Sequence, residues 1–299
     1  MKDVSDVSAY DLNRGLRHAI LKDIESLQNQ FEGFDGVLIS GDIAYSGKLD
    51  EYIRAREWLN LICGAIKCDP GQVWCVPGNH DVDQSVHKTY AAIVDSHTAL
   101  RASTDLSTDL PHRLDNLENG PLLFQPLQAY HEHFAAKYGC PTTCKFPHWE
   151  DTLHLNDGSR LRIRGINSAY CSSRMDHRIT APLIVGPMQT VFYREADVVY
   201  LTICHHPPDW IKDGHEVEQA LNADSHIQLF GHKHFHEHRK VNNSIILSSG
   251  AVHPARTDQD WEPRYYLLSL AVKGTGAGRS LEVSLVLPQN VWVAEGAKS

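Results

Sequence analysis

The chain has 299 residues, of which 42% are hydrophobic and 22% are charged, a composition typical of a soluble globular protein. A formal net charge of −9 and the lack of a long basic run argue against binding a nucleic-acid backbone through charge alone. They do not exclude that the protein is an enzyme acting on a nucleotide. The charged N-terminal segment does not resemble a signal peptide, and no apolar run approaches the roughly 18 residues of a membrane span. The seven cysteines form an odd set in largely apolar surroundings, which favours reduced thiols and a cytoplasmic location.

The first part of the chain alternates between helix and strand patterns. Apolar residues at helical spacing predict an amphipathic helix over residues 11 to about 30, and "GVLIS" at 36–40 predicts a buried strand. The same order repeats with a helix around 52–62 and the strand "VWCVP" at 73–77. This alternation favours parallel strands joined by crossover helices.

The sequence pattern changes over residues 82–158, where polar and proline-containing segments separate segments with helical periodicity. We interpret 1–299 as a single domain in which this segment is an insertion that covers part of the site. Further strands are predicted at "RLRIRGI", "DVVYLTIC" and "HIQLF". The last part, with "SIILSS", "RYYLLSLAV" and "LEVSLVL", predicts a second sheet of antiparallel character.

Four polar blocks directly follow predicted buried strands: "SGDIAYSG", "VPGNHDVD", "ICHHPPDW" and "LFGHKHFH". Sites in open α/β sheets assemble beyond the carboxyl ends of the strands, so these blocks can converge. Their Asp, Asn and His side chains suit Mn, Fe, Zn or Mg rather than metals that prefer thiolates.

This order of blocks resembles the calcineurin-like metallophosphoesterase family. The family pattern runs D-x-H, G-D-x-x-D, G-N-H-D or G-N-H-E, an isolated His, then G-H-x-H, and the last four blocks occur here in order between Gly41 and His234. The resemblance implies a four-layer α/β/β/α sandwich. It also implies metal-dependent hydrolysis of a phosphomonoester or phosphodiester, with the phosphodiester slightly preferred.

The resemblance implies two divalent metal ions and a set of ligands for them. Asp42 would bridge the ions, Asn79, His205 and His232 would complete one site, and His234 would bind the other ion. We prefer His205 to His206 because it lies nearer the end of its strand. A hydroxide shared by the two ions would attack phosphorus in line with the leaving group.

His80 would act as the proton donor to the leaving group, with Asp81 orienting its imidazole. Guanidinium groups match phosphate oxygens, so substrate contacts are also conceivable at four further positions, although a surface role is favoured for each. These positions are Arg174, Arg178, His253 and Arg256.

Each block also has a plainer interpretation. Asp42 could cap a turn, Asn79 and His80 could form a surface turn, and His205 and His206 could belong to a satisfied loop. In "GHKHFHEH" we expect only the first two histidines, 232 and 234, to face the site. The other two, 236 and 238, would lie at the surface or behind the ligands.

Two departures from the family pattern stand out. Tyr45 replaces the second Asp of G-D-x-x-D, and we interpret it as a packing residue near the ligands. The first block, D-x-H, is missing before the first helix, unless Asp6 with Ser8 is its remnant. The D-x-H strings that do occur lie elsewhere, at Asp95/His97, Asp213/His215 and Asp224/His226.

The missing block leaves two hypotheses open. The sequence is N-terminally incomplete, so that the first strand of the fold is missing, or the protein is a relative with one metal or none. The alternative function is then a recognition or regulatory module with an incomplete dinuclear site. Neither the oligomeric state nor the physiological substrate can be predicted from these motifs.

Overall fold

A six-stranded mixed sheet lies at the centre of the computed structural model, which describes residues 14–28, 30–31, 33–174, 176, 182–234, 237–252 and 264–286. The strand order is β3-β4-β5-β6-β8-β7, with β4, β5, β6 and β8 parallel and the edge strands β3 and β7 antiparallel to their neighbours. The strands are β3 (His148–His154), β4 (Arg160–Ile166), β5 (Val198–Cys204), β6 (Ile227–Phe230), β7 (Glu237–Val241) and β8 (Ser244–Ser248). The central strands β5 and β6 are almost fully buried, as apolar parallel strands covered on both faces should be.

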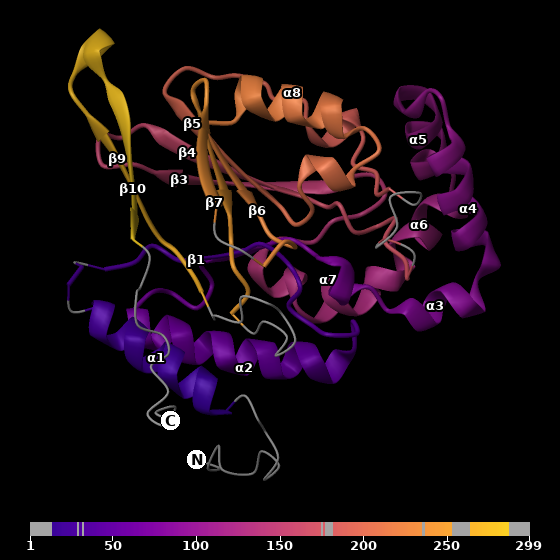
Figure 1. Cartoon of the computed structure of the whole chain (residues 1–299), viewed down its shortest axis with the longest axis horizontal. Coiled ribbons are helices and arrows are strands. Elements are labelled where there is room, and N and C mark those ends of the chain that lie inside the picture. The colour runs from indigo at the N-terminus through magenta and orange to yellow at the C-terminus, as the bar shows by residue number, and fades with distance from the viewer. Residues whose placement is uncertain are drawn as a thin grey trace, which may run out of the picture.

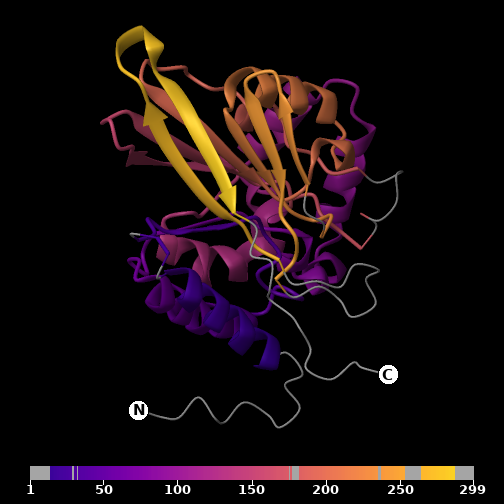
Figure 2. The same ribbon diagram turned by 60° about the vertical axis from the view of Figure 1, so that its left-hand side comes forward.

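A second, smaller β layer consists of β1 (Val37–Ile39) and β2 (Val73–Cys75), which pair in parallel. Helices α1 (Arg14–Gln28) and α2 (Leu49–Ile66) pack together beneath this pair, whereas α8 (Gly214–Asp224) lies on the far side of the six-stranded sheet (Figures 1 and 2). The layers therefore follow the order α, β, β, α. This arrangement confirms the fold predicted from the sequence.

The segment after β2 is helical. It contains α3 (Gln84–Thr89), α4 (Ala91–Ala102), α5 (Leu106–Asp115), α6 (Asn119–Phe124) and α7 (Gln128–His133). Tyr130 packs edge-on and Phe134 packs at a tilt against Tyr52 of α2, with ring centroids 6.1 and 5.9 Å away, so this segment shares the main core. β3, at the end of the predicted insertion, is an edge strand of the larger sheet. The division of the chain into one domain with an insertion stays a prediction.

The end of the chain differs from the prediction in one respect. "RYYLLSLAV" and "LEVSLVL" do contain an antiparallel pair, β9 (Leu267–Lys273) and β10 (Ser280–Val286). "SIILSS", however, forms β8, which pairs in parallel with β6 inside the larger sheet. The reason is β7, an unpredicted edge strand that turns tightly into β8 and whose exposed, charged residues give no alternating pattern.

Residues 1–13 lie outside the described part of the chain, and with them Asp6 and Ser8. Both hypotheses on the missing first block therefore stay predictions. None of the described helices has the length and apolar character required to cross a membrane.

The buried His97 on α4 should make stability depend on pH. Its side chain is almost fully buried, and burial lowers its pKa from 6.5 to about 3. Between these values the unfolded chain binds the proton and the folded chain does not, so stability falls as the pH drops below 6.5. Each pH unit in this window should cost up to about 1.4 kcal/mol from this residue alone.

Urea unfolding of the His97→Asn variant between about pH 6.5 and 4 tests this prediction. The variant should show a shallower loss of unfolding free energy than the wild type. His112→Asn, at an exposed position of the same helical segment, is the matched control and should keep the wild-type slope. An equal slope in the wild type and in His97→Asn would contradict the prediction.

Candidate metal centre

Four loops meet at the carboxyl ends of strands from both β layers. Asp42 follows β1, Asn79 follows β2, His205 and His206 follow β5, and His232 follows β6. The side chains contact one another although Asn79 and His232 are 153 positions apart in the sequence, and Asp42 and His205 are farther apart still. The convergence that the strand-end pattern predicts is therefore present for these five residues.

The Asn79 side chain is the hub of this site. Its Oδ1 lies 3.3 Å from His205 Nε2, 3.2 Å from His206 Nε2 and 3.0 Å from His232 Nδ1. Within the described part of the chain, these three histidines form the group of metal-ligating side chains whose donor atoms all lie within 4.8 Å of one another. His205 and His206 are buried and His232 is half-buried.

This donor set fits a divalent metal ion. Asn79 Oδ1 can accept from two imidazoles, and His205 Nε2 also lies 3.2 Å from Asp42 Oδ2. Imidazole nitrogens suit Fe and Zn, and amide and carboxylate oxygens suit Mn and Mg. The cluster therefore offers a divalent cation both kinds of donor atom.

Two of the rings are held from behind by fixed partners. His205 Nδ1 donates to the Ser40 carbonyl at 2.6 Å, which leaves Nε2 to face Asn79. His206 Nδ1 lies 2.8 Å from the Ser168 hydroxyl, with its Nε2 also towards Asn79. Bonds of this kind to the outer nitrogen fix the tautomer and orientation of metal-binding histidines.

Asp42 lies beside His205 and is held in a strained backbone conformation. Its Oδ2 is 3.2 Å from His205 Nε2, its Oδ1 accepts from the His80 amide at 2.9 Å, and its φ is +55°. These contacts require the backbone at residues 41 and 78 to lie very close to the side chains of His205 and Asp42. A Cβ at Gly78 would overlap the Asp42 carboxylate and one at Gly41 would overlap the His205 ring, which explains both glycines.

The charges of the cluster are strongly coupled. Burial alone would raise the pKa of Asp42, but the adjacent His205 outweighs it and holds that pKa well below its usual range. Burial likewise opposes the charged form of His205, yet the Asp42 carboxylate raises the net pKa of this imidazole. Burial and the two neighbouring histidines lower the pKa of His206 well below its usual value, so His206 stays neutral and keeps a lone pair for a metal.

His80 lies at the edge of the cluster and is not oriented by Asp81. Its Nδ1 donates to the Tyr45 carbonyl at 3.0 Å, and its ring stacks on the Tyr45 ring with centroids 5.3 Å apart. Tyr45 thus contacts His80 in two ways: its backbone carbonyl accepts a hydrogen bond from the imidazole, and its ring packs on the imidazole ring. Tyr45 is 80% exposed, so both rings face the open side of the site.

The expectation that Asp81 orients the His80 imidazole is wrong. Asp81 is fully buried, and its carboxylate accepts from the amides of Ala44 and Gly78, each at 2.9 Å, and from the Tyr52 hydroxyl at 3.1 Å. Burial and the Asp42 charge raise the pKa of Asp81 to about 6. Its carboxylate therefore ties the Asp42 loop to the Asn79 loop and has no contact with the imidazole.

The remaining candidates lie elsewhere. His234 is exposed, has a φ of +57° and is not part of the three-histidine group. Arg174 is exposed, as is His238 on β7, whereas Arg178, His253, Arg256 and His236 lie outside the described residues. The histidines of the three D-x-H strings, His97, His215 and His226, are on α4, on α8 and just before β6, away from the cluster.

His206 joins the cluster although the sequence favours only His205, which lies nearer the strand end. Both rings reach Asn79 Oδ1 at almost the same distance. The chain bends at residues 205 and 206 as soon as β5 ends, and after the extended Pro207 it enters the 3-10 turn Pro208–Trp210. The "HHPP" string could therefore have indicated that both histidines turn towards the site.

Comparison with known families decides where the chain belongs. The family model for calcineurin-like phosphoesterases matches residues 4–236, which contain every residue of the cluster. The chain belongs to the calcineurin-like phosphoesterase family. Phosphoester hydrolysis with divalent metals is the general chemistry of this family.

A curated relative supports the same family. The chain is 25% identical over 231 residues to the metallophosphoesterase-like protein YydB of Bacillus subtilis (strain 168). The match covers 73% of this chain but 44% of that protein, so the chain spans less than half of the relative.

Replacing the Asp81 carboxylate should loosen both of the loops that it joins. Asp81→Asn removes one of two buried acceptor oxygens and should lower the free energy of unfolding by about 2 kcal/mol or more. Tyr52→Phe removes a single hydroxyl bond and should cost about 1 kcal/mol. Urea denaturation measures both, with Asp95→Asn at an exposed position of α4 as the neutral control. An Asp81→Asn variant as stable as this control would show that the carboxylate does not brace the loops.

Proposed function

We propose that the protein is a metal-dependent phosphodiesterase whose metal is held by Asn79, His205, His206 and His232, with Asp42 beside them. The observation that carries this proposal is the approach of three imidazole nitrogens to the single Asn79 oxygen, within 3.0 to 3.3 Å. A divalent cation bound there would polarise a phosphoester and neutralise the charge that develops as the ester breaks. Mn is the ion we favour because the amide and carboxylate oxygens suit it, while the imidazoles would also accept Fe or Zn.

His80 is proposed as the group that protonates the leaving alcohol. The Tyr45 carbonyl holds its Nδ1 proton, so Nε2 is the nitrogen that can deliver a proton to a substrate. The Asp42 carboxylate accepts from the His80 backbone amide at 2.9 Å, which keeps this histidine at the edge of the metal ligands. Stacking on Tyr45 limits the rotation of the ring.

Two further points belong to the proposal. His234 would bind a second ion only if other ligands complete the coordination of that ion, so metal analysis decides between one ion and two.

The seven cysteines are all free thiols, which supports the reducing cytoplasmic setting expected from the sequence.

Hydrolysis of bis-p-nitrophenyl phosphate with Mn²⁺ tests the activity. The wild type should turn over, chelation should abolish the activity, and added Mn²⁺ should restore it. His206→Ala and His232→Ala should lose both metal and activity, because each removes an imidazole from the cluster. His80→Ala should keep its metal and lose about 100-fold or more in kcat, since it removes only the proton donor.

His238→Ala, at an exposed position of β7, is the control and should behave as the wild type. A wild-type protein that binds Mn²⁺ but hydrolyses neither phosphodiesters nor phosphomonoesters would contradict the enzyme proposal. That result would favour the recognition or regulatory role.

A further inference from the structure

The turn that carries His232 is strained. His232 has a φ of +67°, and the Lys233 amide donates to the Gly231 carbonyl at 2.8 Å, which closes a three-residue turn around it. A turn of this size with a positive φ at its centre is the rare, strained form. A non-glycine residue in such a conformation costs about 1 to 3 kcal/mol, so tertiary contacts must hold it in place.

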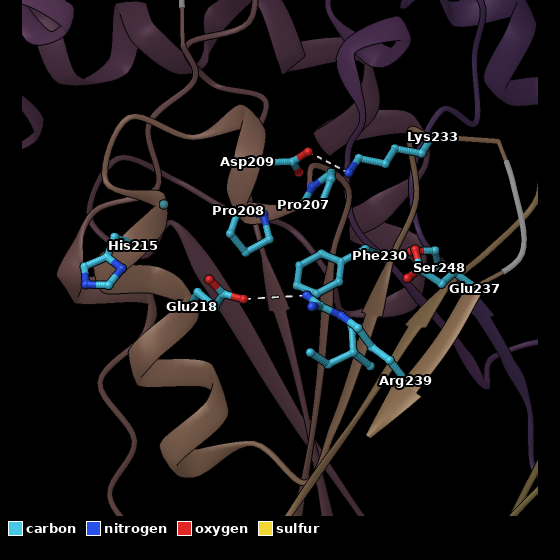
Figure 3. Close-up of a pocket in the computed structure, with 12 residues that line it drawn as sticks. Pro207, Pro208, Asp209, His215, Glu218, Phe230, Lys233, Glu237, Arg239 and Ser248 are labelled. Carbon is cyan, nitrogen blue, oxygen red and sulfur yellow. Dashed lines mark hydrogen bonds and ion pairs between the residues drawn. The ribbon is translucent and has the colours of Figure 1, made fainter. Parts of the chain in front are cut away.

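Two contacts from one neighbouring element hold this turn. The element is the short 3-10 turn η6 (Pro208–Trp210), which follows His206. The Trp210 indole meets the His232 ring edge to face, with centroids 4.2 Å apart and planes at 75°. On the next residue, Lys233 Nζ forms an ion pair with Asp209 at 2.6 Å, which Figure 3 shows reaching across from the His232 loop.

The η6 turn is itself anchored to the fold. Trp210 donates its amide to the Pro207 carbonyl at 3.0 Å, and its own carbonyl accepts from the Leu183 amide at 3.0 Å. Leu183 is fully buried, and its carbonyl accepts from the Lys212 amide at 2.7 Å. η6 is therefore a fixed support rather than a loose loop that follows the histidine.

His232 consequently lies among several fixed groups, which include the rings of His206 and His205 with centroids 4.7 and 5.4 Å away. Asn79 Oδ1 faces its Nδ1 at 3.0 Å, and the Trp210 indole packs on the ring at 4.2 Å. Removing the indole would allow the ring to rotate and the turn to relax towards an unstrained φ. Either change would move Nδ1 away from the cluster.

We propose that Trp210, assisted by the Asp209–Lys233 ion pair, is a positioning residue for His232. It keeps the strained turn in the conformation that aims Nδ1 at the metal, without touching the metal or the substrate itself. This inference rests on the proposed function, because it takes His232 as a ligand. Asp209 and Trp210 end the "ICHHPPDW" block, but the family pattern specifies only a histidine there.

Isothermal titration of the purified full chain with Mn²⁺ tests this inference independently of catalysis. Trp210→Ala should bind Mn²⁺ about 10- to 100-fold more weakly than the wild type, the usual loss when a group that orients a ligand is removed. Trp210→Phe keeps an aromatic face and should recover most of the affinity. Asp209→Asn should weaken binding only a few-fold, and this difference should shrink as NaCl rises, because the pair is partly exposed and therefore screened.

Matched controls separate positioning from general destabilisation. Trp58→Ala removes another half-buried tryptophan, on α2, and Asp50→Asn breaks the exposed ion pair with Arg54. Both controls should bind Mn²⁺ as the wild type does, and far-ultraviolet circular dichroism should show that every variant is folded. If Trp210→Ala is the one variant that is unfolded, the Mn²⁺ affinities of Trp210→Phe and Asp209→Asn decide whether the positioning role holds. That role requires Asp209→Asn to bind Mn²⁺ more weakly than Trp210→Phe does.

The possible outcomes distinguish the two proposals. If the wild type binds Mn²⁺ and His232→Ala does not, but the folded Trp210 and Asp209 variants bind normally, the positioning role is wrong and the metal site stands. Equal losses in Trp210→Ala and Trp58→Ala would also overturn the positioning role. A wild type that binds no Mn²⁺ would overturn the proposed function, and this inference with it.

Discussion

The approach of three histidine rings to one asparagine oxygen is the constraint on which the rest of the site depends. Imidazoles at 3.0 to 3.3 Å from a single acceptor, two of them buried, cannot all be satisfied by that acceptor. Asp42 Oδ2, 3.2 Å from His205 Nε2, adds a carboxylate oxygen, so one carboxylate, one amide and three imidazoles converge here. A divalent cation is the partner whose chemistry matches these atoms.

Two hubs organise the site, the half-buried Asn79 and the buried Asp81. Asn79 gathers side chains from the loops after β5 and β6, while Asp81, two residues later, gathers backbone amides from the loops after β1 and β2. Both residues belong to one short "GNHD" string. This string therefore connects the loops of the smaller β layer with those of the six-stranded sheet. The proposed proton donor, His80, lies between the two hubs in the chain.

Backbone strain is present in the loops that follow the strand ends. Asp42, His232 and His234 all have positive φ values, which side-chain-bearing residues rarely adopt. Such conformations persist only when surrounding contacts over-determine them. The glycines at 41 and 78 allow the close approach of the loops, and η6 packs against the His232 turn.

Much of the architecture could be predicted from hydrophobic periodicity. The helices at Arg14–Gln28 and Leu49–Ile66 and the central strands follow the expected patterns, because each buries one clear apolar face or run. β7 could not be predicted, since an exposed edge strand has no apolar face to mark it. The place of β8 in the larger sheet depends on that hidden strand.

The composition of the site was predictable, but its detailed contacts were not. Asp42, Asn79, His205 and His232 could be found because they follow strand ends within recognisable blocks. The role of Asp81 depends on backbone amides that leave no trace in the sequence, and the choice between His205 and His206 depends on how the chain turns after β5. Trp210 acts across space on a residue far along the chain, which no local pattern reveals.

The most direct test of the central claim is anomalous diffraction at the manganese edge from crystals grown with Mn²⁺. The account predicts an anomalous peak among Asn79 Oδ1, His205 Nε2, His206 Nε2 and His232 Nδ1. Crystals with saturating Mn²⁺ but no peak at this position, whether or not a peak appears beside His234, would contradict it.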